Sequence, residues 1–290
     1  VICALCVIAG IAWPRLPAFA GEDPLTITLI DVGQGQSVFI EFPNRETLLL
    51  DGGGFYKNSL DVGKLVVAPF LLHRGIRKID YLGATHSDND HISGLESILD
   101  VFPVQHYLDR AGPTGDRRLE RLREKARSKG AVPLVLQTGK PIRIGEVKLV
   151  LLHPDKNFIE ENGNGNGRIG NDLSLVLRLE YRDFSLLLTG DIGEKAESHL
   201  IAQHAPLQST FLIAPHHGSR FSNTLPFIRA VHPRMVLFSS GYLNRMRHPH
   251  PDVLKRYESV GVEIRRTDRH GALTLSTDGF THRIETHENL

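Results

Sequence analysis

The chain has 290 residues, of which 41% are hydrophobic and 23% are charged, a composition that is ordinary for a globular protein. Lysine and arginine number 34 and aspartate and glutamate 33, so the net charge is +1. This balance excludes a strongly basic nucleic-acid-binding protein, and any contact with DNA must come from local patches. The length suffices for one large core or at most two domains.

The chain opens with an uncharged apolar run at residues 1–13, followed by Pro14 and Arg15. The run is too short to span a bilayer, and two interpretations of residues 1–20 remain. One is the end of a transmembrane helix with Arg15 at the interface. The other is the remnant of a signal peptide with a cleavage site at residues 18–20. We favour the helix, and both interpretations place the globular part outside the cytoplasm or tether it to the membrane.

The two cysteines of the chain, Cys3 and Cys6, lie inside this apolar run. No second cysteine pair exists to complete a zinc site. The remaining sequence therefore excludes both disulfides and a cysteine nucleophile.

After residue 24 the sequence predicts three short strands and then strands that alternate with helices. The segment at residues 65–72 is either a helix or a buried segment broken by Pro69, and residues 162–167 predict a flexible loop. Mixed sheets flanked by helices indicate one layered α/β domain over residues 25–287. The expected strands are residues 25–31, 37–42, 47–50, 79–85, 104–108, 132–136, 142–152, 173–180, 184–188, 211–214, 234–239, 262–266, 271–277 and 280–286, and the expected helices are residues 92–102, 116–129, 193–203, 251–259 and a segment from residue 223.

The most informative feature is the hexapeptide His-Ser-Asp-Asn-Asp-His at residues 86–91. It follows the expected strand at residues 79–85 and precedes the expected helix at residues 92–102, a position where open α/β sheets place ligands. A solvated turn needs one or two polar residues, whereas this loop crowds together four side chains that bind metal ions. These are His86, Asp88, Asp90 and His91.

Three more expected strands end in aspartate or histidine, namely those before Asp51, Asp191 and His216. The ends of such strands can converge on one edge of a layered sheet. Imidazole and carboxylate together suit zinc or manganese, and a carboxylate can bridge two ions about 3.5–4 Å apart. Such a centre activates water, so it requires no serine or cysteine nucleophile. For Asp51 the alternative role is to orient a ligand histidine or the following glycine turn.

Several short motifs lie between and after the expected strands. They are residues 31–37 (DVGQGQS), 50–53 (LDGG), 86–91 (HSDNDH), 171–177 (NDLSLVL), 188–191 (LTGD), 216–219 (HHGS), 248–249 (HP) and 267–272 (TDRHGA). Together they resemble the metallo-β-lactamase superfamily, whose signature is HxHxDH. More narrowly, the chain is similar to the C-terminal hydrolase domain of ComEC-type DNA-uptake competence proteins over nearly the whole of residues 25–285.

The resemblance implies a four-layer αββα sandwich and a hydrolase with two divalent metal ions, manganese or zinc. The implied metal ligands are His86 and Asp88 at one ion, Asp90, His91 and His216 at the other, and Asp191 as the bridge. The implied catalytic residues are Asp90, Asp191 and His248, the last of which would contact the substrate or stabilise the leaving group. The implied substrate-binding residues are Asn171, His217, Ser219 and Arg220, with His217 as the alternative ligand to His216.

Two residues depart from the pattern of the family. Asp88 stands where the superfamily usually has histidine, which makes that site richer in oxygen and shifts its preference toward manganese over zinc. Gln36 stands where the competence family usually has aspartate. If that aspartate tunes the site, activity in this chain is reduced.

The resemblance points to DNA as the substrate of a nuclease that degrades the non-transported strand during DNA uptake for natural transformation. It implies single-stranded DNA and the membrane channel region of the same polypeptide as partners, and a location on the extracytoplasmic face of the inner membrane. We expect the isolated domain to be monomeric. Two alternatives remain open: an envelope phosphodiesterase or phosphorylcholine-esterase-like metallohydrolase, and a non-catalytic DNA-handling module with a degenerate site.

Local positive charge gives modest support for DNA as the substrate. The expected helix at residues 116–129 is basic, but a solvated and partly self-paired helix face is the favoured interpretation. Arg220, Arg245 and Arg247 are better candidates for phosphate contacts, because they flank the proposed site. Tyr242 is expected to pack within the protein rather than to stack on a base.

Overall fold

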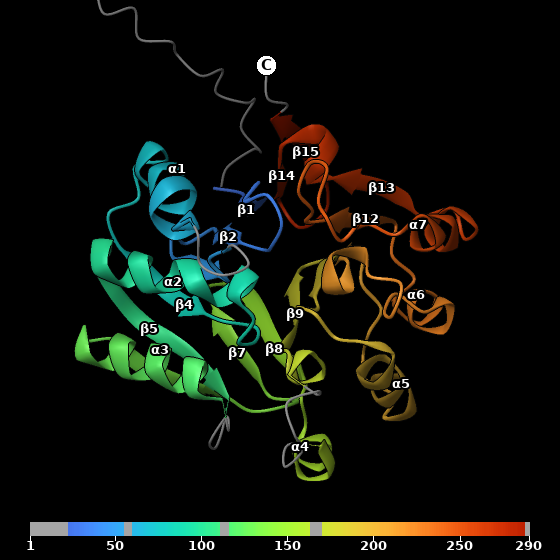
Figure 1. Ribbon diagram of the computed structural model, residues 1–290, viewed down its shortest axis with the longest axis horizontal. Coiled ribbons are helices and arrows are strands. Elements are labelled where there is room, and N and C mark those ends of the chain that lie inside the picture. The colour runs from blue at the N-terminus through green and yellow to red at the C-terminus, as the bar shows by residue number, and fades with distance from the viewer. Residues whose placement is uncertain (1–22, 55–59, 111–115, 163–169, 288–290) are drawn as a thin grey trace, which may run out of the picture.

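The computed structural model describes residues 23–54, 60–110, 116–162 and 170–287. Two mixed sheets pack face to face, and helices cover the outer face of each sheet (Figure 1). Within the described ranges, no helix is both long and apolar enough to cross a membrane. The membrane or signal segment expected at residues 1–20 lies outside these ranges.

Among the described residues, the first sheet has eight strands and the second has seven. In spatial order, the first sheet contains β15 (His282–His287), β14 (Ala272–Thr277), β1 (Leu25–Leu29), β2 (Val38–Glu41), β3 (Thr47–Leu50), β4 (Ile79–Gly83), β5 (Val104–Arg110) and β6 (Val132–Leu136). The second sheet contains β13 (Glu263–Arg266), β12 (Met235–Phe238), β11 (Phe211–Ile213), β10 (Phe184–Leu188), β9 (Val176–Tyr181), β8 (Val147–His153) and β7 (Pro141–Ile144).

The helices divide between the two outer faces. The first sheet is covered by the π-helix η2 (Gly63–Val67) and by α1 (Ala68–His73), α2 (Asn89–Val101) and α3 (Arg117–Ser128). The second sheet is covered by α5 (Glu194–Ala202), α6 (Leu225–Val231) and α7 (Pro251–Glu258). The short elements α4 (Lys156–Asn162), η3 (Asn171–Leu173), η4 (Pro215–Gly218) and α8 (Thr267–His270) lie in connections. The structure therefore confirms the expected four-layer αββα sandwich.

Three apolar clusters hold the layers together, one between the sheets and one beneath each helical layer. Strand β3 contributes to two of them, because Leu48 and Leu50 face the other sheet while Leu49 faces the helices. Strand β10 repeats this pattern. Strands that are buried on both faces have continuous apolar sequences, and in this protein such strands lead directly into the candidate site.

The structure decides one alternative that the sequence leaves open and divides one expected strand into two. Residues 65–72 are helical, and Pro69 lies in the first turn of α1, directly after the π-helix η2. The strand expected at residues 142–152 is instead the hairpin of β7 and β8. The chain reverses at Gly145, whose φ of 58° is in the left-handed region that glycine adopts without strain.

Other differences concern short elements. The sequence does not predict α4 and α8, because elements of seven and four residues carry too little apolar periodicity. Of the loop expected at residues 162–167, Asn162 ends α4 and the other residues lie outside the described ranges. Strand β9 begins at Val176 rather than at residue 173, because η3 occupies residues 171–173.

One edge of the sandwich carries the carboxyl ends of two pairs of parallel strands. In the first sheet β3 runs parallel to β4, and in the second sheet β10 runs parallel to β11. These strands lead into Asp51, the loop at residues 86–91, Asp191 and the turn η4. The sequence predicts that these polar strand ends converge on one edge of a layered sheet. In the structure they do converge, and the strands that precede them belong to both sheets.

Candidate metal centre

Two histidines in segments that follow strands of opposite sheets face each other in the middle of the site. His91 lies in the first turn of α2, and its Nδ1 is 2.8 Å from Asp51 Oδ2. His217 lies in η4, and its Nδ1 is 3.0 Å from the carbonyl oxygen of Ser239. Because a carboxylate and a carbonyl accept hydrogen bonds, both Nδ1 atoms donate. In the neutral imidazole each Nε2 therefore carries the lone pair, as in metal-binding histidines.

A third histidine, His86, is oriented through a hydroxyl group. The Thr85 hydroxyl donates to Asp51 Oδ2 over 2.8 Å, so its oxygen is left to accept from His86 Nδ1, 3.0 Å away. His86 Nε2 is buried and has no hydrogen-bond partner in the described part of the chain. Burial, together with the charge on His91, lowers the pKa of His86. The imidazole is therefore neutral, and its Nε2 lone pair is available to a cation.

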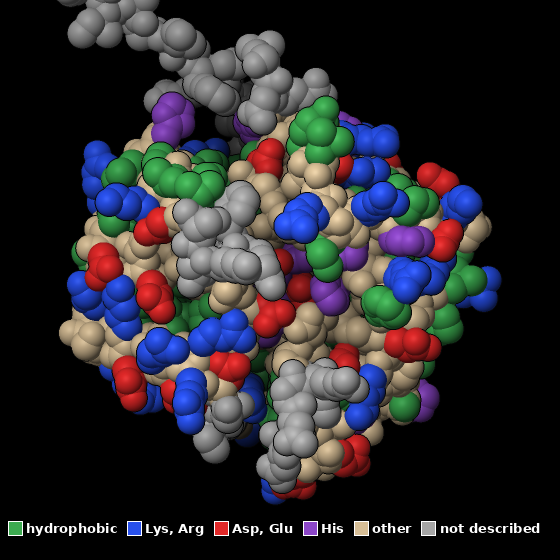
Figure 2. Space-filling model, viewed as in Figure 1, with side chains coloured by type: hydrophobic (Ala, Val, Ile, Leu, Met, Phe, Trp, Pro, Cys, Tyr) green, Lys and Arg blue, Asp and Glu red, His purple; other side chains and the backbone are tan. Residues whose placement is uncertain are grey.

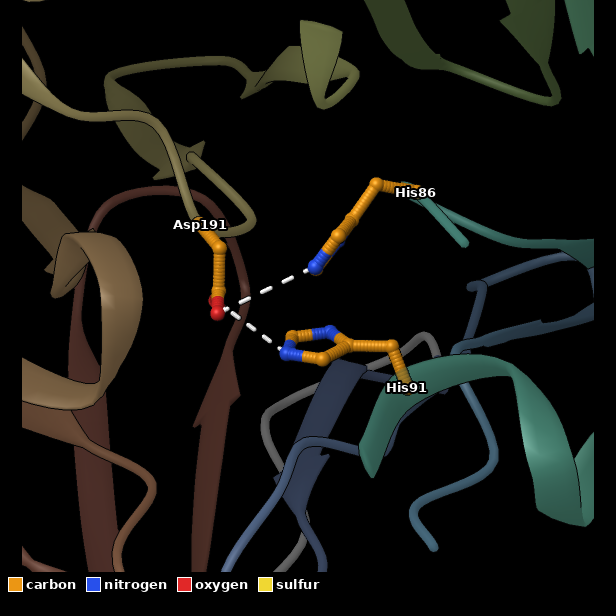
Figure 3. Close-up of side chains that lie close together, drawn as sticks. All are labelled: His86, His91 and Asp191. Atoms are coloured by element: carbon orange, nitrogen blue, oxygen red, sulfur yellow. Dashed lines mark ion pairs between the residues drawn. The ribbon is translucent and has the colours of Figure 1, made fainter. Parts of the chain in front are cut away.

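The three Nε2 atoms point toward the carboxylate of Asp191, as Figure 3 shows for His86 and His91. The carboxylate oxygens of this buried residue lie 3.1 Å from His91 Nε2, 3.5 Å from His217 Nε2 and 3.8 Å from His86 Nε2. The Asp191 backbone N–H donates to Ser174 Oγ over 3.1 Å, which positions the turn after β10. Burial alone would raise the pKa of Asp191, but the charges on His91 and His217 hold that pKa well below its ordinary value.

Asp90 lies on the more accessible side of the same cluster. Its Oδ2 is 3.3 Å from His217 Nε2, and its side chain is 29% exposed. Burial would raise the pKa of Asp90, but the hydrogen bond with His217 and the charge on His91 lower it well below the usual range. Figure 2 shows histidine and acidic side chains gathered in a hollow near the middle of this face, with lysine and arginine side chains on both sides.

These side chains fit a divalent cation. Two groups of ligand atoms within 4.8 Å of one another share His91, which joins His86 and Asp191 in one group and Asp90 and His217 in the other. The Nε2 atoms of His91 and His217 are only 3.2 Å apart, so their lone pairs repel unless a cation or a proton lies between them. Burial would lower the pKa of His91, but neighbouring carboxylates raise it, and their negative field also attracts a metal ion. Imidazole and carboxylate donors suit zinc or manganese.

Comparison with known proteins agrees with this geometry. The family model described as the metallo-beta-lactamase superfamily matches residues 30–235, more than half of the chain. The matched region contains all of the histidines and aspartates of the two ligand groups. The chain belongs to this superfamily. The resemblance inferred from the motifs is thereby confirmed.

Individual relatives narrow the resemblance to competence proteins. The ComE operon protein 3 of Bacillus subtilis (strain 168) is 29% identical over 258 residues, covering 85% of this chain and 32% of the relative. The Competence protein ComA of Neisseria gonorrhoeae is 29% identical over 272 residues, covering 93% of this chain and 35% of the relative. The chain thus spans about a third of the length of these curated relatives.

A solved structure supports the fold assignment independently. The metallo-beta-lactamase fold protein YhfI from Bacillus subtilis has a TM-score of 0.56 to this chain at 12% sequence identity, and the match covers 88% of this chain and 100% of that chain. At this identity the likeness concerns the fold. The metallo-β-lactamase fold expected from the motifs is confirmed.

Asp88, which departs from the superfamily signature, and Gln36, which departs from the competence-family pattern, have distinct surroundings. The Asp88 carboxylate lies 3.9 Å from His86 Nε2 and 3.7 Å from Arg118 Nη2, and it is 43% exposed, so it borders the cluster without joining either close ligand group. Gln36 donates from Nε2 to Asp51 Oδ2 over 3.0 Å. The amide therefore supplies to Asp51 a hydrogen bond that the carboxylate usual in the competence family could donate only when protonated.

The structure separates the two adjacent histidines of η4. The resemblance implies His216 as the ligand and His217 as the alternative, whereas the geometry places His217 in a close ligand group. His216 Nε2 is 3.7 Å from Asp191 Oδ2, and its side chain is 29% exposed. The φ angles of His216 and His217 are 50° and 54°, and such left-handed backbone costs about 1–2 kcal/mol per residue. Strain of this kind concentrates at functional sites, and here it turns His217 inward toward the Ser239 carbonyl.

His248 lies beside the centre, where the sequence analysis expects a group that contacts substrate. Its ring centroid is 6.0 Å from that of His216, and its Nδ1 is buried with no hydrogen-bond partner among the described residues. Burial and the charge on His217 lower the pKa of His248 to about 4, so this imidazole is neutral near pH 7.

The other expected substrate-binding residues lie further from the ligand groups. Asn171 begins η3, and its carbonyl oxygen accepts from Ser174 Oγ over 2.6 Å, which supports the turn that carries Asp191. Ser219 is buried directly after η4, and Arg220 is exposed beside it. The structure therefore places these residues around the centre rather than in it.

Two residues that orient the histidines, Thr85 and Ser239, are not predicted from the sequence. A local signal exists for Thr85, because it stands between β4 and the first histidine of the hexapeptide. Ser239 follows β12 and is 22 residues from His217, so no local motif connects the two. For Asp51, the structure favours the role of orienting a ligand histidine, one of the two alternatives that the sequence leaves open.

Proposed function

We propose that the chain is a metal-dependent phosphodiesterase that cleaves DNA during DNA uptake for natural transformation. The observation that carries this proposal is the convergence of three buried histidines, each held at Nδ1 by a protein group, on one buried carboxylate. Membership of the metallo-beta-lactamase superfamily supports the hydrolase, and relatives named as competence proteins support the biological setting.

Residues from both sheets would hold two divalent ions. The proposed ligands are Asp90, His91 and His217 at one ion, His86 and Asp88 at the other, and Asp191 between them. When bound, such ions polarise a phosphoryl oxygen and lower the pKa of a water molecule. The oxygen-rich donor set around Asp88 favours manganese over zinc.

The residues around the ligands would keep each donor in the correct protonation state. Asp51 holds a proton of His91 at Nδ1, so that Nε2 would present its lone pair to a bound ion. Asp90 stays ionised because its pKa is far below neutrality. The neutral His248, on the accessible side next to His216, would donate a hydrogen bond to the phosphate or to the leaving oxygen.

The proposal of DNA as the substrate draws on the relatives and on local charge. Arg220, Arg245 and Arg247 are exposed in the segments that flank η4, where they would contact phosphates. We further propose single-stranded DNA as the form cleaved and the membrane channel region of the same polypeptide as the partner that delivers it. The domain would act as a monomer on the extracytoplasmic face of the inner membrane.

Incubation of the purified chain with Mn²⁺ or Zn²⁺ and an end-labelled single-stranded oligonucleotide tests the proposal. The wild-type chain should cleave the oligonucleotide, and the Asp90→Ala variant should not. Cleavage of small phosphodiesters alone would instead support an envelope phosphodiesterase or a phosphorylcholine-esterase-like hydrolase. Oligonucleotide binding with neither cleavage nor bound metal would support a non-catalytic DNA-handling module.

A further inference from the structure

Two surface segments, residues 219–223 and 241–248, flank the turn that carries His217. The second segment has a fixed backbone, because the side chain of Asn244 bridges its ends. Asn244 Nδ2 donates to the carbonyl oxygens at both ends of the segment, over 2.9 and 2.6 Å, and Asn244 Oδ1 accepts from the His248 backbone N–H over 2.9 Å. The loop therefore has a defined shape although its side chains face solvent.

This loop is also attached to the body of the protein at both ends. Gly241 packs so closely against the loop after β1 that an added Cβ would lie 2.7 Å from the backbone nitrogen of Gln34. Just beyond the other end, the His250 backbone N–H donates to the Gly218 carbonyl over 2.9 Å. The position of the loop next to the metal centre is thus set by close packing and hydrogen bonds.

Large apolar side chains project outward from these two segments. Phe221 is 67% exposed, Tyr242 78%, Leu243 83% and Met246 64%. The expectation that Tyr242 packs within the protein is therefore wrong, because the Asn244 bridge turns this part of the loop toward solvent. Exposed apolar side chains that gather beside a site are typical of an interaction surface.

Three arginines accompany these apolar side chains, namely Arg220, Arg245 and Arg247, and all are exposed. In the part of the chain that the structure describes, none of them forms an ion pair. On α3, by contrast, several basic side chains are paired, Arg123 with Glu120 of the same helix over 2.9 Å and Lys125 with Asp100 of α2 over 2.7 Å. The positive charge beside the metal centre is thus available to an anionic ligand.

One contact shows how the two kinds of side chain work together. The guanidinium carbon of Arg220 lies 4.7 Å from the ring centroid of Phe221. An arginine in this position holds the aromatic ring in place and can still contact a phosphate from its edge. Aromatic faces combined with arginines are the usual elements of surfaces that bind single-stranded nucleic acid.

We propose that this surface, hereafter the rim, is a stacking platform for the unpaired bases next to the scissile phosphate. The rim consists of Phe221, Tyr242, Leu243 and Met246 with Arg220, Arg245 and Arg247. The identity of its ligand rests on the proposed function. Every base has a π-face, so stacking on Phe221 and Tyr242 requires no particular sequence. Bases within a duplex are already stacked on one another, so the rim selects single strands.

A lipid bilayer is the competing occupant, because aromatic, aliphatic and basic side chains also suit a membrane interface. The location of the rim argues against it. Both segments border the turn that carries His217, so a bilayer that took up the rim would lie against the metal centre, where the substrate must enter. A polynucleotide whose phosphate reaches the centre must itself pass over this surface.

Fluorescence anisotropy of a labelled oligothymidylate with the purified chain in EDTA tests the rim. Phe221→Ala and Tyr242→Ala should each weaken binding about tenfold, and Tyr242→Trp should restore it. Phe280→Ala is the matched control, because Phe280 is 65% exposed and Arg182 lies 5.5 Å from its ring, as Arg220 lies near Phe221. Arg182 follows β9 and precedes β10, at the end of β10 opposite to Asp191, so this control should bind like the wild type.

Equal affinities in the wild type and in the two alanine variants of the rim would overturn the proposal, as would absence of oligonucleotide binding by the wild type. If these variants instead lose flotation with anionic phospholipid vesicles and keep oligonucleotide binding, the rim belongs to a membrane contact and the proposal is wrong. The assay requires no cleavage. If the rim variants weaken oligonucleotide binding but the wild type shows no hydrolysis, the proposed nuclease is refuted and the rim proposal stands. If the wild type hydrolyses DNA but the rim variants bind as it does, the rim proposal is refuted and the nuclease stands.

Discussion

Two clusters of buried polar side chains in this molecule differ in how their atoms are satisfied. In the first cluster, the Glu197 carboxylate accepts from the backbone N–H groups of Asn223 and Thr224 at the start of α6, the latter over 2.9 Å. The Tyr257 hydroxyl donates to Asn223 Oδ1 over 2.8 Å. These polar atoms meet protein partners, so the cluster joins α5, α6 and α7 without a ligand.

In the candidate metal centre, the two ring nitrogens of each histidine have different surroundings. The Nδ1 atoms of His86, His91 and His217 are held by protein groups, whereas their Nε2 atoms converge on Asp191. Burial and carboxylate chemistry are common to both clusters. The inward-facing lone pairs are what distinguish a ligand site from a structural network.

The largest expected effect comes from replacing one buried carboxylate in each cluster by its amide. Asp191→Asn removes the charge on which the three Nε2 atoms converge, so we expect loss of bound metal and a fall in hydrolysis of more than ~100-fold, the upper end for residues that merely support a ligand. Glu197→Gln should keep its metal and its activity at pH 7. Metal content and initial rates of the two purified variants check this, and a metal-loaded, active Asp191→Asn variant would contradict the site.

The next comparison lies within η4. His217→Ala removes a member of a close ligand group, so metal affinity and activity should fall by more than ~100-fold, whereas His216→Ala should lower them by less than ~10-fold. Titration with Mn²⁺ followed by calorimetry separates the two variants. The reverse order of effects would restore His216 as the ligand.

A smaller effect is expected for the residue that orients His91. Asp51→Asn retains the shape of the side chain but removes the carboxylate that holds the Nδ1 proton, so metal affinity should fall by ~10–100-fold. Asp80→Asn is the control, since Asp80 is also buried but accepts from the Thr47 backbone N–H over 2.9 Å at the start of β4. Equal losses of metal affinity in both variants would indicate a general effect on folding instead.

A change of metal preference is expected at the residue that departs from the superfamily signature. Asp88→His replaces an oxygen donor by a nitrogen donor next to His86, so the ratio of Zn²⁺ to Mn²⁺ affinity should rise, on the order of tenfold for about 1.4 kcal/mol of preference. Competition between the two ions, followed by metal analysis, measures this ratio. An unchanged ratio would place Asp88 outside the coordination of either ion.

The smallest effect on the metal centre is expected from titration of Glu197 in the first cluster. Its ionisation should change the stability of the protein and not its metal affinity. Burial raises the pKa of Glu197 from 4.5 to about 7, although hydrogen bonds from Thr224 and Asn223 oppose the shift. The folded state therefore binds this proton more tightly than the unfolded state, so the contribution of Glu197 to stability is greatest below pH 4.5 and is lost as the pH rises to about 7. The total loss is about 3 kcal/mol. Thermal unfolding between pH 5 and 8 should show this slope in the wild type and not in Glu197→Gln.

Much of the fold and of the site is predictable because it is local in sequence. The apolar runs of β3 and β10 are followed directly by Asp51 and Asp191, and such runs identify both the strands and the residues at their ends. The density of ligand types at residues 86–91 indicates a metal site without reference to any other part of the chain. Each of these patterns extends over fewer than ten residues.

The choice between His216 and His217 is not predictable in this way. The two residues are adjacent and have identical chemistry, so no local pattern distinguishes them. The left-handed backbone of η4 and the distant Ser239 carbonyl make the choice. The exposure of Tyr242 is similar, because it depends on the hydrogen bonds of Asn244 and not on the aromatic residue itself.

The sequence alone determined the chemistry of the candidate ligands, the strand ends that carry them and the superfamily, because each is encoded by an apolar run and the polar residues next to it. Only the tertiary structure decided that two sheets supply one centre and which ring nitrogen of each histidine faces inward. These features depend on acceptors far away in the chain, such as Asp51 for His91 and Ser239 for His217. Folding alone brings such partners within hydrogen-bonding distance.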